Sequence, residues 1–128
     1  MTEKRAVVYV IDDDESVRRA FSRLLRSVGF DVETFSSAEE FLGNPMQTHN
    51  ACILMDIRMP GLTGFELQKR LVSQGIEIPV IVISASDDVQ AREQARELGA
   101  VGFFRKPVDD QALLDSIWWA ISRRRKNG

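Results

Sequence analysis

The chain carries near its middle the run Cys52-Ile53-Leu54-Met55-Asp56-Ile57-Arg58-Met59-Pro60-Gly61. The apolar part of this run is short and continuous, which is typical of a strand buried on both faces of a parallel sheet. A carboxylate stands at the end of the strand, and the Pro-Gly pair predicts a turn after it. Because a buried carboxylate is costly unless it is paired or used, we predict that Asp56 has a function there.

Similar apolar runs recur along the chain and alternate with helical patterns. We predict strands over 6–11, 31–35, 51–55, 79–84 and 100–105. We predict helices over 15–28, 37–42 and 64–74, a fourth from 87 or 88 to 98, and a fifth from 109 onward. Such alternation indicates an α/β fold with a parallel sheet. Right-handed crossovers favour five strands in the order 2-1-3-4-5, doubly wound with helices on both faces, as in flavodoxin-like folds.

Hydrophobic periodicity also predicts which side chains pack on the sheet. In the first helix the apolar stripe extends from Val17 to Val28, and in the last helix it includes Trp118. Trp119 lies one step off that stripe, where an exposed aromatic often marks a contact surface. The fourth helix is polar and Ala-rich, so we expect it to be weakly anchored. The run Ser37-Ala38-Glu39-Glu40 matches a capping box at the start of the second helix.

The composition is that of one globular domain. The chain has 128 residues, and its 17 Lys and Arg against 19 Asp and Glu give a net charge of -2, so no global positive field attracts nucleic acid or lipid. Cys52, the single cysteine, excludes a disulfide framework and fits a small core residue in a reducing compartment. The first apolar run is too short for a signal peptide or a membrane span. We therefore predict a cytoplasmic protein.

Polar side chains stand at four of the predicted strand ends. Asp12-Asp13 follows the first strand, Asp56 ends the third, and Ser84 ends the fourth. Lys106 follows the fifth strand. Because the functional site of an open α/β sheet lies beyond the carboxyl ends of its strands, we expect these groups to converge. Carboxylates so close repel one another, and Mg²⁺ would relieve this repulsion.

A carboxylate in such a site can act as a nucleophile on phosphorus. Phosphoryl transfer needs alignment and charge neutralisation more than proton chemistry, and Mg²⁺, the Lys106 ammonium and the Ser84 hydroxyl supply both. We therefore predict that Asp56 is covalently phosphorylated. Plainer interpretations exist for the separate parts, because Asp14 or Glu15 can simply cap the first helix. A lone serine or lysine at a strand end is usually a surface residue.

The sequence resembles the receiver domain of two-component response regulators, from Val7 to about Arg123. The matching pieces are Val10-Ile11-Asp12-Asp13, the segment 55–61, Ser84-Ala85 and Lys106-Pro107. The resemblance is to the branch whose receivers precede a helix-turn-helix output domain, which includes regulators of nitrogen fixation and aromatic catabolism. It implies a CheY-like fold, with residues 1–123 as the receiver domain and 124–128 as a basic tail or the start of a linker.

The resemblance implies a role for each matching side chain. Asp56 would accept a phosphoryl group from a histidine kinase, and Ser84 and Lys106 would contact that group. The metal would be Mg²⁺, for which Mn²⁺ or Ca²⁺ could substitute. Its protein ligands would be Asp12, Asp13, Asp56 and the backbone carbonyl of Arg58.

The resemblance also implies how the domain would switch. The Lys106-Pro107 peptide bond would be cis, which only an X-Pro bond adopts at low cost. Phe103 occupies the position of the switch aromatic, which rotates as Ser84 moves toward the phosphate. The chain departs from the similar branch after Ser84-Ala85, where Ser86-Asp87-Asp88 replaces a common His-Gly-Asp.

Taken together, these implications describe a phosphorylation-activated signalling switch. It would control transcription through an output domain outside this chain, or alternatively act as a stand-alone receiver by protein–protein contact. It would not be an enzyme beyond weak Mg-dependent self-phosphorylation and autodephosphorylation. We expect a phosphorylation-dependent homodimer through the fourth helix, last strand and last helix. We expect no nucleic-acid contact by this domain and no membrane contact.

Two other functions fit parts of the pattern. A haloacid-dehalogenase-type phosphatase also uses an aspartyl phosphate, but it places a second Asp two residues after the nucleophile, where this chain has Arg58. A flavodoxin-like cofactor binder would have a phosphate loop rich in Ser, Thr and Gly after the first strand. The acidic run 12–15 would instead repel a bound phosphate.

Overall fold

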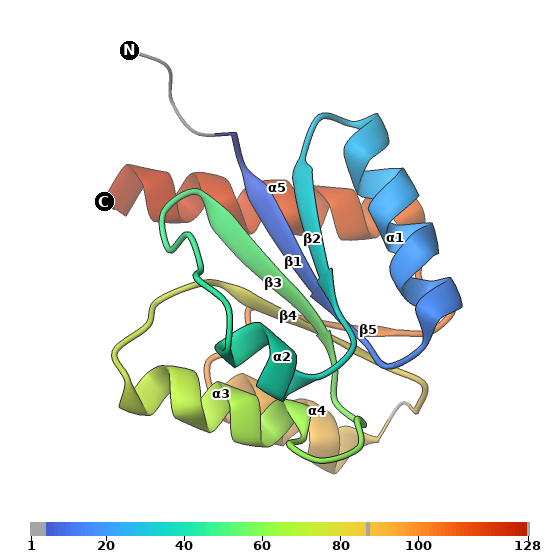
Figure 1. Ribbon diagram of the computed structural model, residues 1–128, viewed down its shortest axis with the longest axis vertical. Coiled ribbons are helices and arrows are strands. Elements are labelled where there is room, and N and C mark those ends of the chain that lie inside the picture. Colours follow the sequence, from blue (N-terminus) through green and yellow to red (C-terminus); the bar gives the residue numbers. More distant parts are fainter. Residues whose placement is uncertain (1–4, 87, 128) are drawn as a thin grey trace.

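The structure of the protein, a computed structural model, describes residues 5–86 and 88–127 (Figure 1). The strands are β1 (Val7–Ile11), β2 (Asp31–Phe35), β3 (Ala51–Asp56), β4 (Val80–Ser84) and β5 (Gly102–Arg105). The helices are α1 (Glu15–Ser27), α2 (Ala38–Leu42), α3 (Gly64–Ser73), α4 (Val89–Glu97) and α5 (Asp110–Asn127). All ten predicted elements are therefore present, with ends shifted by a few residues.

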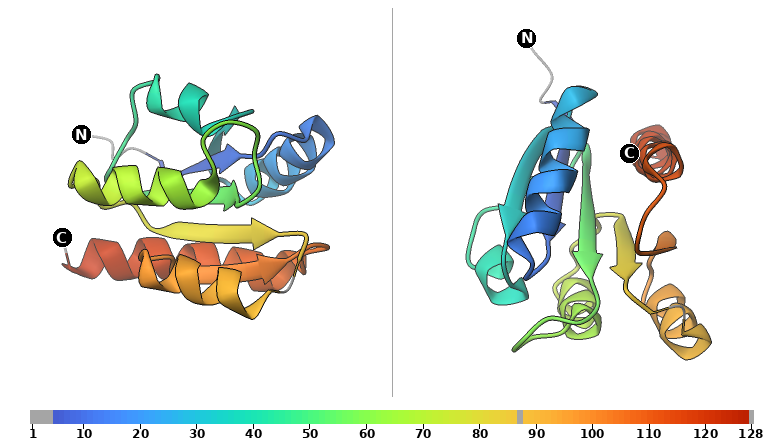
Figure 2. Two further views of the ribbon diagram at one scale, coloured as in Figure 1. Left: turned by 90° about the horizontal axis from the view of Figure 1, so that it is seen from below. Right: turned by 90° about the vertical axis from the view of Figure 1, so that its right-hand side faces the viewer.

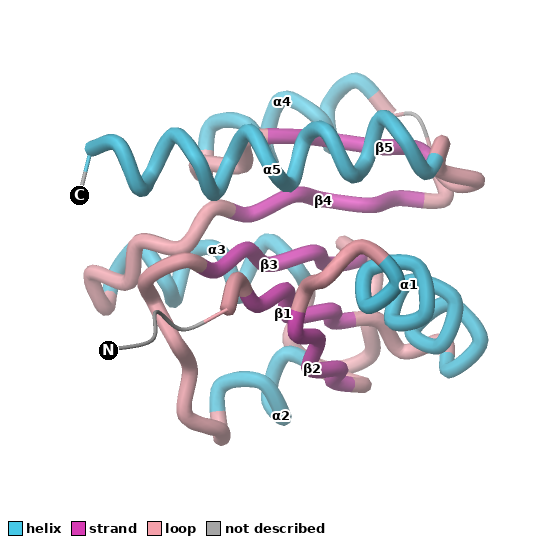
Figure 3. The backbone as a smooth tube through the Cα atoms, turned by 90° about the horizontal axis from the view of Figure 1, so that it is seen from above, coloured by secondary structure: helices cyan, strands magenta, loops and turns pink. Residues whose placement is uncertain are grey.

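The five strands form one parallel sheet in the predicted order β2-β1-β3-β4-β5. Figure 3 shows this order, with β2 and β5 at the two edges. β1, β3 and β4 are buried along their whole length, as their continuous apolar sequences predict, whereas β2 buries only Val32 and Phe35. The free edge of β2 is partly covered, because the Arg26 guanidinium donates a hydrogen bond of 3.1 Å to the Val32 carbonyl.

Helices cover both faces of the sheet and create two separate cores (Figure 2). On one face, α2, α3 and α4 contribute Phe41, Leu67 and Ala95 to a cluster with alternate strand residues. On the other face, α1 and α5 contribute Leu25 and Ile117. The sheet is thus shielded from water on both sides, as a parallel sheet requires. No described helix combines the length and apolar character that crossing a membrane needs.

Side chains cap the N-termini of helices α1 to α4. Asp14 caps α1 by accepting from the Ser16 N–H, and Asp88 caps α4 in the same way through the Gln90 N–H. The alternative cap Asp87 lies outside the described residues. The capping box predicted for α2 forms only in part, because Ser37 accepts the Glu40 N–H but the Glu40 carboxylate bonds to Ser36. A complete capping box occurs at α3 instead.

Two predicted core positions are wrong. Trp118 is 45% exposed and lies with its ring centroid 4.5 Å from that of Phe30. Val28 is 40% exposed because it is the C-cap of α1, where the backbone leaves the helical path. Trp119 is 52% exposed, as predicted. α5 runs through Asn127, so most of the segment predicted as a tail or linker is helical.

Other predictions about single residues are confirmed. Ala95 is the buried residue of α4, in agreement with its polar, Ala-rich sequence, and the weak anchoring of this helix stays a prediction. Cys52 is fully buried in the core, and burial raises the pKa of its thiol to about 12. The Lys106-Pro107 peptide bond is cis.

Candidate functional site

The carboxyl ends of four strands bring the predicted side chains together. Asp56 is the last residue of β3 and Ser84 the last of β4. Asp12 follows β1 directly, and Lys106 follows β5. Because neighbouring strands are parallel and in register, these positions lie along one edge of the sheet. The predicted convergence is therefore confirmed.

Three carboxylates form an acidic cluster at this edge. Oxygen atoms of Asp12, Asp13 and Asp56 all lie within 4.8 Å of one another. Asp12 and Asp56 are buried, whereas Asp13 is exposed. Three carboxylate oxygens at this spacing form a hard, anionic donor set, which fits a divalent cation that binds carboxylates and keeps several waters.

Lys106 joins two members of the acidic cluster. Its ammonium Nζ lies 3.1 Å from Oδ2 of Asp12 and 3.2 Å from Oδ2 of Asp56. Burial alone would lower the pKa of Lys106, but the hydrogen bonds and charges of the two carboxylates outweigh it and raise the pKa. Lys106 therefore stays protonated and supplies a fixed positive charge beside Asp56.

Asp12 is held from several directions. Its Oδ1 accepts the Asp14 N–H at 2.9 Å, and its backbone carbonyl accepts a 2.7 Å hydrogen bond from the Arg18 guanidinium. Burial raises the pKa of Asp12, and its hydrogen bonds to Asp14 and Lys106 oppose that shift only in part. The folded protein without a bound cation thus disfavours the charged form of Asp12, which a cation would reverse.

The loop after β3 packs closely on the end of that strand. The Arg58 N–H donates to Oδ1 of Asp56 at 3.1 Å, and the Arg58 side chain is exposed. A Cβ added to Gly64 would lie 2.9 Å from the Asp56 carbonyl oxygen and the Ile57 Cα. Farther along the loop, the Leu62 N–H donates to Oε2 of Glu39 at 3.1 Å. Neither support of the loop was predicted from the sequence, although Gly64 directly follows Thr63, the N-cap of α3.

Ser84 and Phe103 occupy neighbouring strands beside the acidic cluster. Ser84 is buried, and its Oγ accepts the Ser86 N–H at 3.2 Å. Phe103 is half-buried on β5, and the Arg92 guanidinium lies 5.4 Å from its ring centroid. Phe104 is also half-buried, so neither ring of the pair is fully enclosed. Movement of Ser84 and rotation of Phe103 remain predictions.

Comparison with known proteins places this fold and site in one family. The family described as the response regulator receiver domain matches residues 8–118. Nodulation protein W of Bradyrhizobium diazoefficiens is 42% identical over 122 residues, which are 95% of this chain and 54% of that protein. Transcriptional regulatory protein FixJ of Azorhizobium caulinodans is 39% identical over 121 residues, 94% of this chain and 57% of that protein. The crystal structure of FixJ-N has a TM-score of 0.85 and 35% identity, and covers 94% of this chain and 96% of that one.

The chain belongs to the response regulator receiver domain family, which confirms the resemblance noted in its sequence. It is a signalling domain of two-component systems, whose receivers interact with sensor kinases, and its relatives are transcription regulators. The chain spans little more than half the length of these curated relatives.

Proposed function

We propose that this domain switches on when Asp56 takes a phosphoryl group from a phosphohistidine of a sensor kinase. An Asp56 carboxylate oxygen attacks the phosphorus, the new P–O bond forms, and the P–N bond to the donor imidazole breaks. The observation that carries the proposal is the contact of Lys106 with both Asp12 and Asp56 inside the acidic cluster. This contact places a positive charge where the phosphoryl oxygens of a modified Asp56 would gather.

The other site residues have supporting roles in this proposal. Asp12, Asp13, Asp56 and the carbonyl of Arg58 would hold Mg²⁺, and Mn²⁺ or Ca²⁺ could replace it. When bound, the cation neutralises charge on the phosphoryl oxygens. Lys106 and the Ser84 hydroxyl would contact the same group, and Phe103 would follow Ser84 inward. Self-phosphorylation and autodephosphorylation would be weak.

Intact mass measurement tests this proposal. The protein is incubated with acetyl phosphate and Mg²⁺, and we expect a mass increase of one phosphoryl group. Asp56→Asn removes the nucleophile and abolishes the increase, whereas Asp115→Asn, an exposed acid on α5, leaves it unchanged. No adduct on the unmodified protein, or an equal yield in Asp56→Asn, would show that Asp56 is not the acceptor.

The complete protein would regulate transcription. This proposal is supported by relatives that carry about as much sequence again as the matched region, and one of them is named a transcriptional regulatory protein. Residues 1–123 would be the receiver and 124–128 the beginning of the connection to an output domain. The alternative is a stand-alone receiver that acts by protein–protein contact. In either case the domain would work in the cytoplasm without touching nucleic acid itself.

Phosphorylation would also produce a homodimer through the α4–β5–α5 face. Trp119 and Val101 are exposed there and line a hollow of about 320 Å³ together with Pro79 and Arg123. The Arg123 guanidinium lies 5.1 Å from the centroid of the Trp119 ring, which leaves an amphipathic contact surface. Sedimentation of the phosphorylated and unphosphorylated protein tests this part. An unchanged monomer mass after phosphorylation would rule out the dimer.

A further inference from the structure

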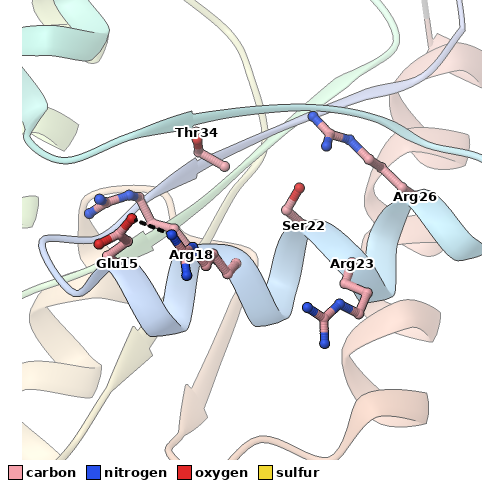
Figure 4. Close-up of a pocket in the computed structure, with 7 residues that line it drawn as sticks. Glu15, Arg18, Ser22, Arg23, Arg26 and Thr34 are labelled. Carbon is pink, nitrogen blue, oxygen red and sulfur yellow. Dashed lines mark hydrogen bonds and ion pairs between the residues drawn. The ribbon is translucent and has the colours of Figure 1, made fainter.

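A groove lined by arginines lies between α1 and β2, on the side of α1 that faces the edge strand (Figure 4). Its volume is about 630 Å³, which is within the range of ligand and peptide sites. The lining residues carry four positive charges and one negative charge, with two hydroxyl groups. They are Glu15, Arg18, Arg19, Ser22, Arg23, Arg26 and Thr34. The domain as a whole carries a net charge of -2. The groove is therefore a positively charged region on a domain whose net charge is negative.

Backbone carbonyls fix the two arginines at the ends of this α1–β2 groove. Arg18 donates to the Asp12 carbonyl at 2.7 Å, and Arg26 donates to the Val32 carbonyl at 3.1 Å. Each of these bonds uses one of the five N–H donors of a guanidinium. Both guanidinium groups are therefore oriented before a ligand arrives and keep donors for it. An arginine held in this way loses less side-chain entropy on binding than a freely moving one.

The remaining side chains shape the groove between those ends. Ser22 and Arg26 extend from α1 toward β2, and Thr34 lies opposite them on the strand (Figure 4). The hydroxyl groups of Ser22 and Thr34 can donate to an anion placed between the arginines. Arg23 points away from β2 (Figure 4), and Arg19 pairs with Glu15 at 2.9 Å. Arg18 and Arg26 are therefore the two recognition points.

The spacing of the recognition points indicates the class of ligand. Arg18 and Arg26 are eight residues apart on one helix, which separates their backbones by about 12 Å. Two carboxylates on one face of a partner helix, two turns apart, match this distance. None of the seven described lining residues is aromatic, so the groove offers no ring on which a nucleic-acid base could stack. The overall negative charge of the domain also opposes a long polyanion.

We propose that the α1–β2 groove binds an acidic segment of a protein partner through Arg18 and Arg26. The proposal does not depend on phosphorylation of Asp56, because neither recognition point belongs to the acidic cluster. Bidentate guanidinium–carboxylate pairs at the two ends would set the position of the segment. The hydroxyl groups of Ser22 and Thr34 would donate hydrogen bonds to oxygen atoms of the segment between those ends.

Fluorescence anisotropy with a defined peptide tests the proposal. The probe is a labelled alanine-based helical peptide that carries two glutamates two turns apart, and its control carries glutamines instead. We expect the glutamate peptide to bind the unmodified domain and the glutamine peptide to bind at least about tenfold more weakly. The double variant Arg18→Gln/Arg26→Gln should lose at least about tenfold in affinity for the glutamate peptide.

Two further variants separate loss of the groove from loss of the fold. Ser22→Glu places a carboxylate between the two arginines without removing either, and should weaken binding at least about tenfold. Arg70→Gln removes an exposed arginine of α3 outside the groove and should change affinity less than about twofold. Each variant is compared by circular dichroism and thermal unfolding.

Three results would overturn the proposal. The first is equal affinity of the glutamate peptide for Arg70→Gln, Ser22→Glu and the double arginine variant. The second is amide chemical-shift changes that map to other elements than α1 and β2 when the peptide is added. The third is displacement of the peptide by an equimolar single-stranded thymidine oligonucleotide, which would assign the groove to nucleic acid instead.

Discussion

Asp12 lies in the site at a cost to the stability of the fold. Burial raises the pKa of Asp12, so the folded protein holds its proton more tightly than the unfolded chain does. The stability that Asp12 contributes is therefore present below its unfolded pKa and is lost as pH rises through its folded pKa. At neutral pH, with no cation bound, the charged group opposes folding.

Asp12→Asn should consequently stabilise the cation-free protein at pH 7, by about 1 kcal/mol or a few degrees in Tm. The gain should shrink as pH falls below the folded pKa of Asp12, because both side chains are then neutral. It should also shrink when Mg²⁺ is added, since only the carboxylate can bind the cation well. Asp115→Asn on the exposed side of α5 serves as the control. A variant that is less stable than the parent at pH 7 would contradict the expectation.

A glycine is required at position 64 because its Cα packs closely against the backbone of Asp56 and Ile57. An added Cβ would lie 2.9 Å from two backbone atoms of the β3 end, and backbone cannot turn away as a side chain can. We expect Gly64→Ala to cost about 1–3 kcal/mol of unfolding free energy and to slow phosphorylation of Asp56, because the strand end must shift. At Gly43 the nearest atom would lie 3.5 Å away, an ordinary contact. Chemical denaturation of Gly64→Ala and Gly43→Ala compares the two, and equal losses would refute the packing argument.

The residues that carry the chemistry could be predicted from the sequence, whereas the residues that hold the loop after β3 in place could not. Asp12, Asp13, Asp56, Ser84 and Lys106 stand at strand ends, and the parallel topology alone brings strand ends together. Glu39 and Gly64 support the loop through contacts that depend on how closely chain segments approach. Such distances are set by tertiary packing and cannot be inferred from the hydrophobic periodicity of the sequence.

At the scale of the elements, α3 begins with a capping box that depends on pH. The Glu66 carboxylate accepts from the Thr63 N–H and hydroxyl, and these bonds lower the pKa of Glu66. A lowered folded pKa means that the stabilisation is present above the unfolded value and is lost as pH falls through the folded one. The parent protein should therefore be more stable than Glu66→Gln at neutral pH.

That difference should disappear in acid. Tm measured between pH 7 and pH 3 should show the two proteins converging as Glu66 becomes protonated in the parent. Thr63→Ala removes the hydroxyl that accepts the Glu66 N–H and donates to the Glu66 carboxylate, so its destabilisation should shrink in acid but not vanish, because the bond from the Glu66 N–H does not titrate. A constant gap between the parent and Glu66→Gln would mean that the carboxylate charge contributes nothing.

Element types and order followed from periodicity, whereas the exposure of Trp118 and Val28 did not. In α5 the residues Leu113, Leu114, Ile117 and Ile121 already fill the arc that faces the sheet. Trp118 is therefore left on the flank, where it covers Phe30 with one face and meets water with the other. The sequence of a helix does not define where its buried face ends, because the width of that face depends on the neighbouring elements.

At the scale of the whole molecule, the sheet topology could be predicted from the sequence, whereas features that depend on contacts between elements could not. The topology was predictable because chirality rules leave few ways to connect five parallel strands. The α1–β2 groove was not predictable, because Arg18 and Arg26 are oriented by backbone carbonyls of other segments. Helix α4 is an intermediate case, since its polar sequence indicates weak anchoring but does not reveal its tether.

That tether is Gln68 on α3. Its Nε2 donates to the Ala95 carbonyl at 3.2 Å, and Ala95 is the buried residue of α4. The Oε1 atom of Gln68 is buried without a hydrogen-bond partner in the described structure. Replacing the amide by an apolar group of similar size thus removes an unsatisfied acceptor together with one hydrogen bond, so the global stability should change little.

Gln68→Leu should therefore release α4 without unfolding the domain. Loss of one net hydrogen bond predicts about fivefold faster hydrogen exchange at the α4 amides, with β1 and β3 unchanged. Gln111→Leu removes an exposed amide that donates to Asp115 within α5, and it should leave the exchange of the α4 amides unchanged. Faster exchange in β1 and β3 to the same extent would indicate global destabilisation, and unchanged α4 amides would show that Gln68 does not restrain this helix.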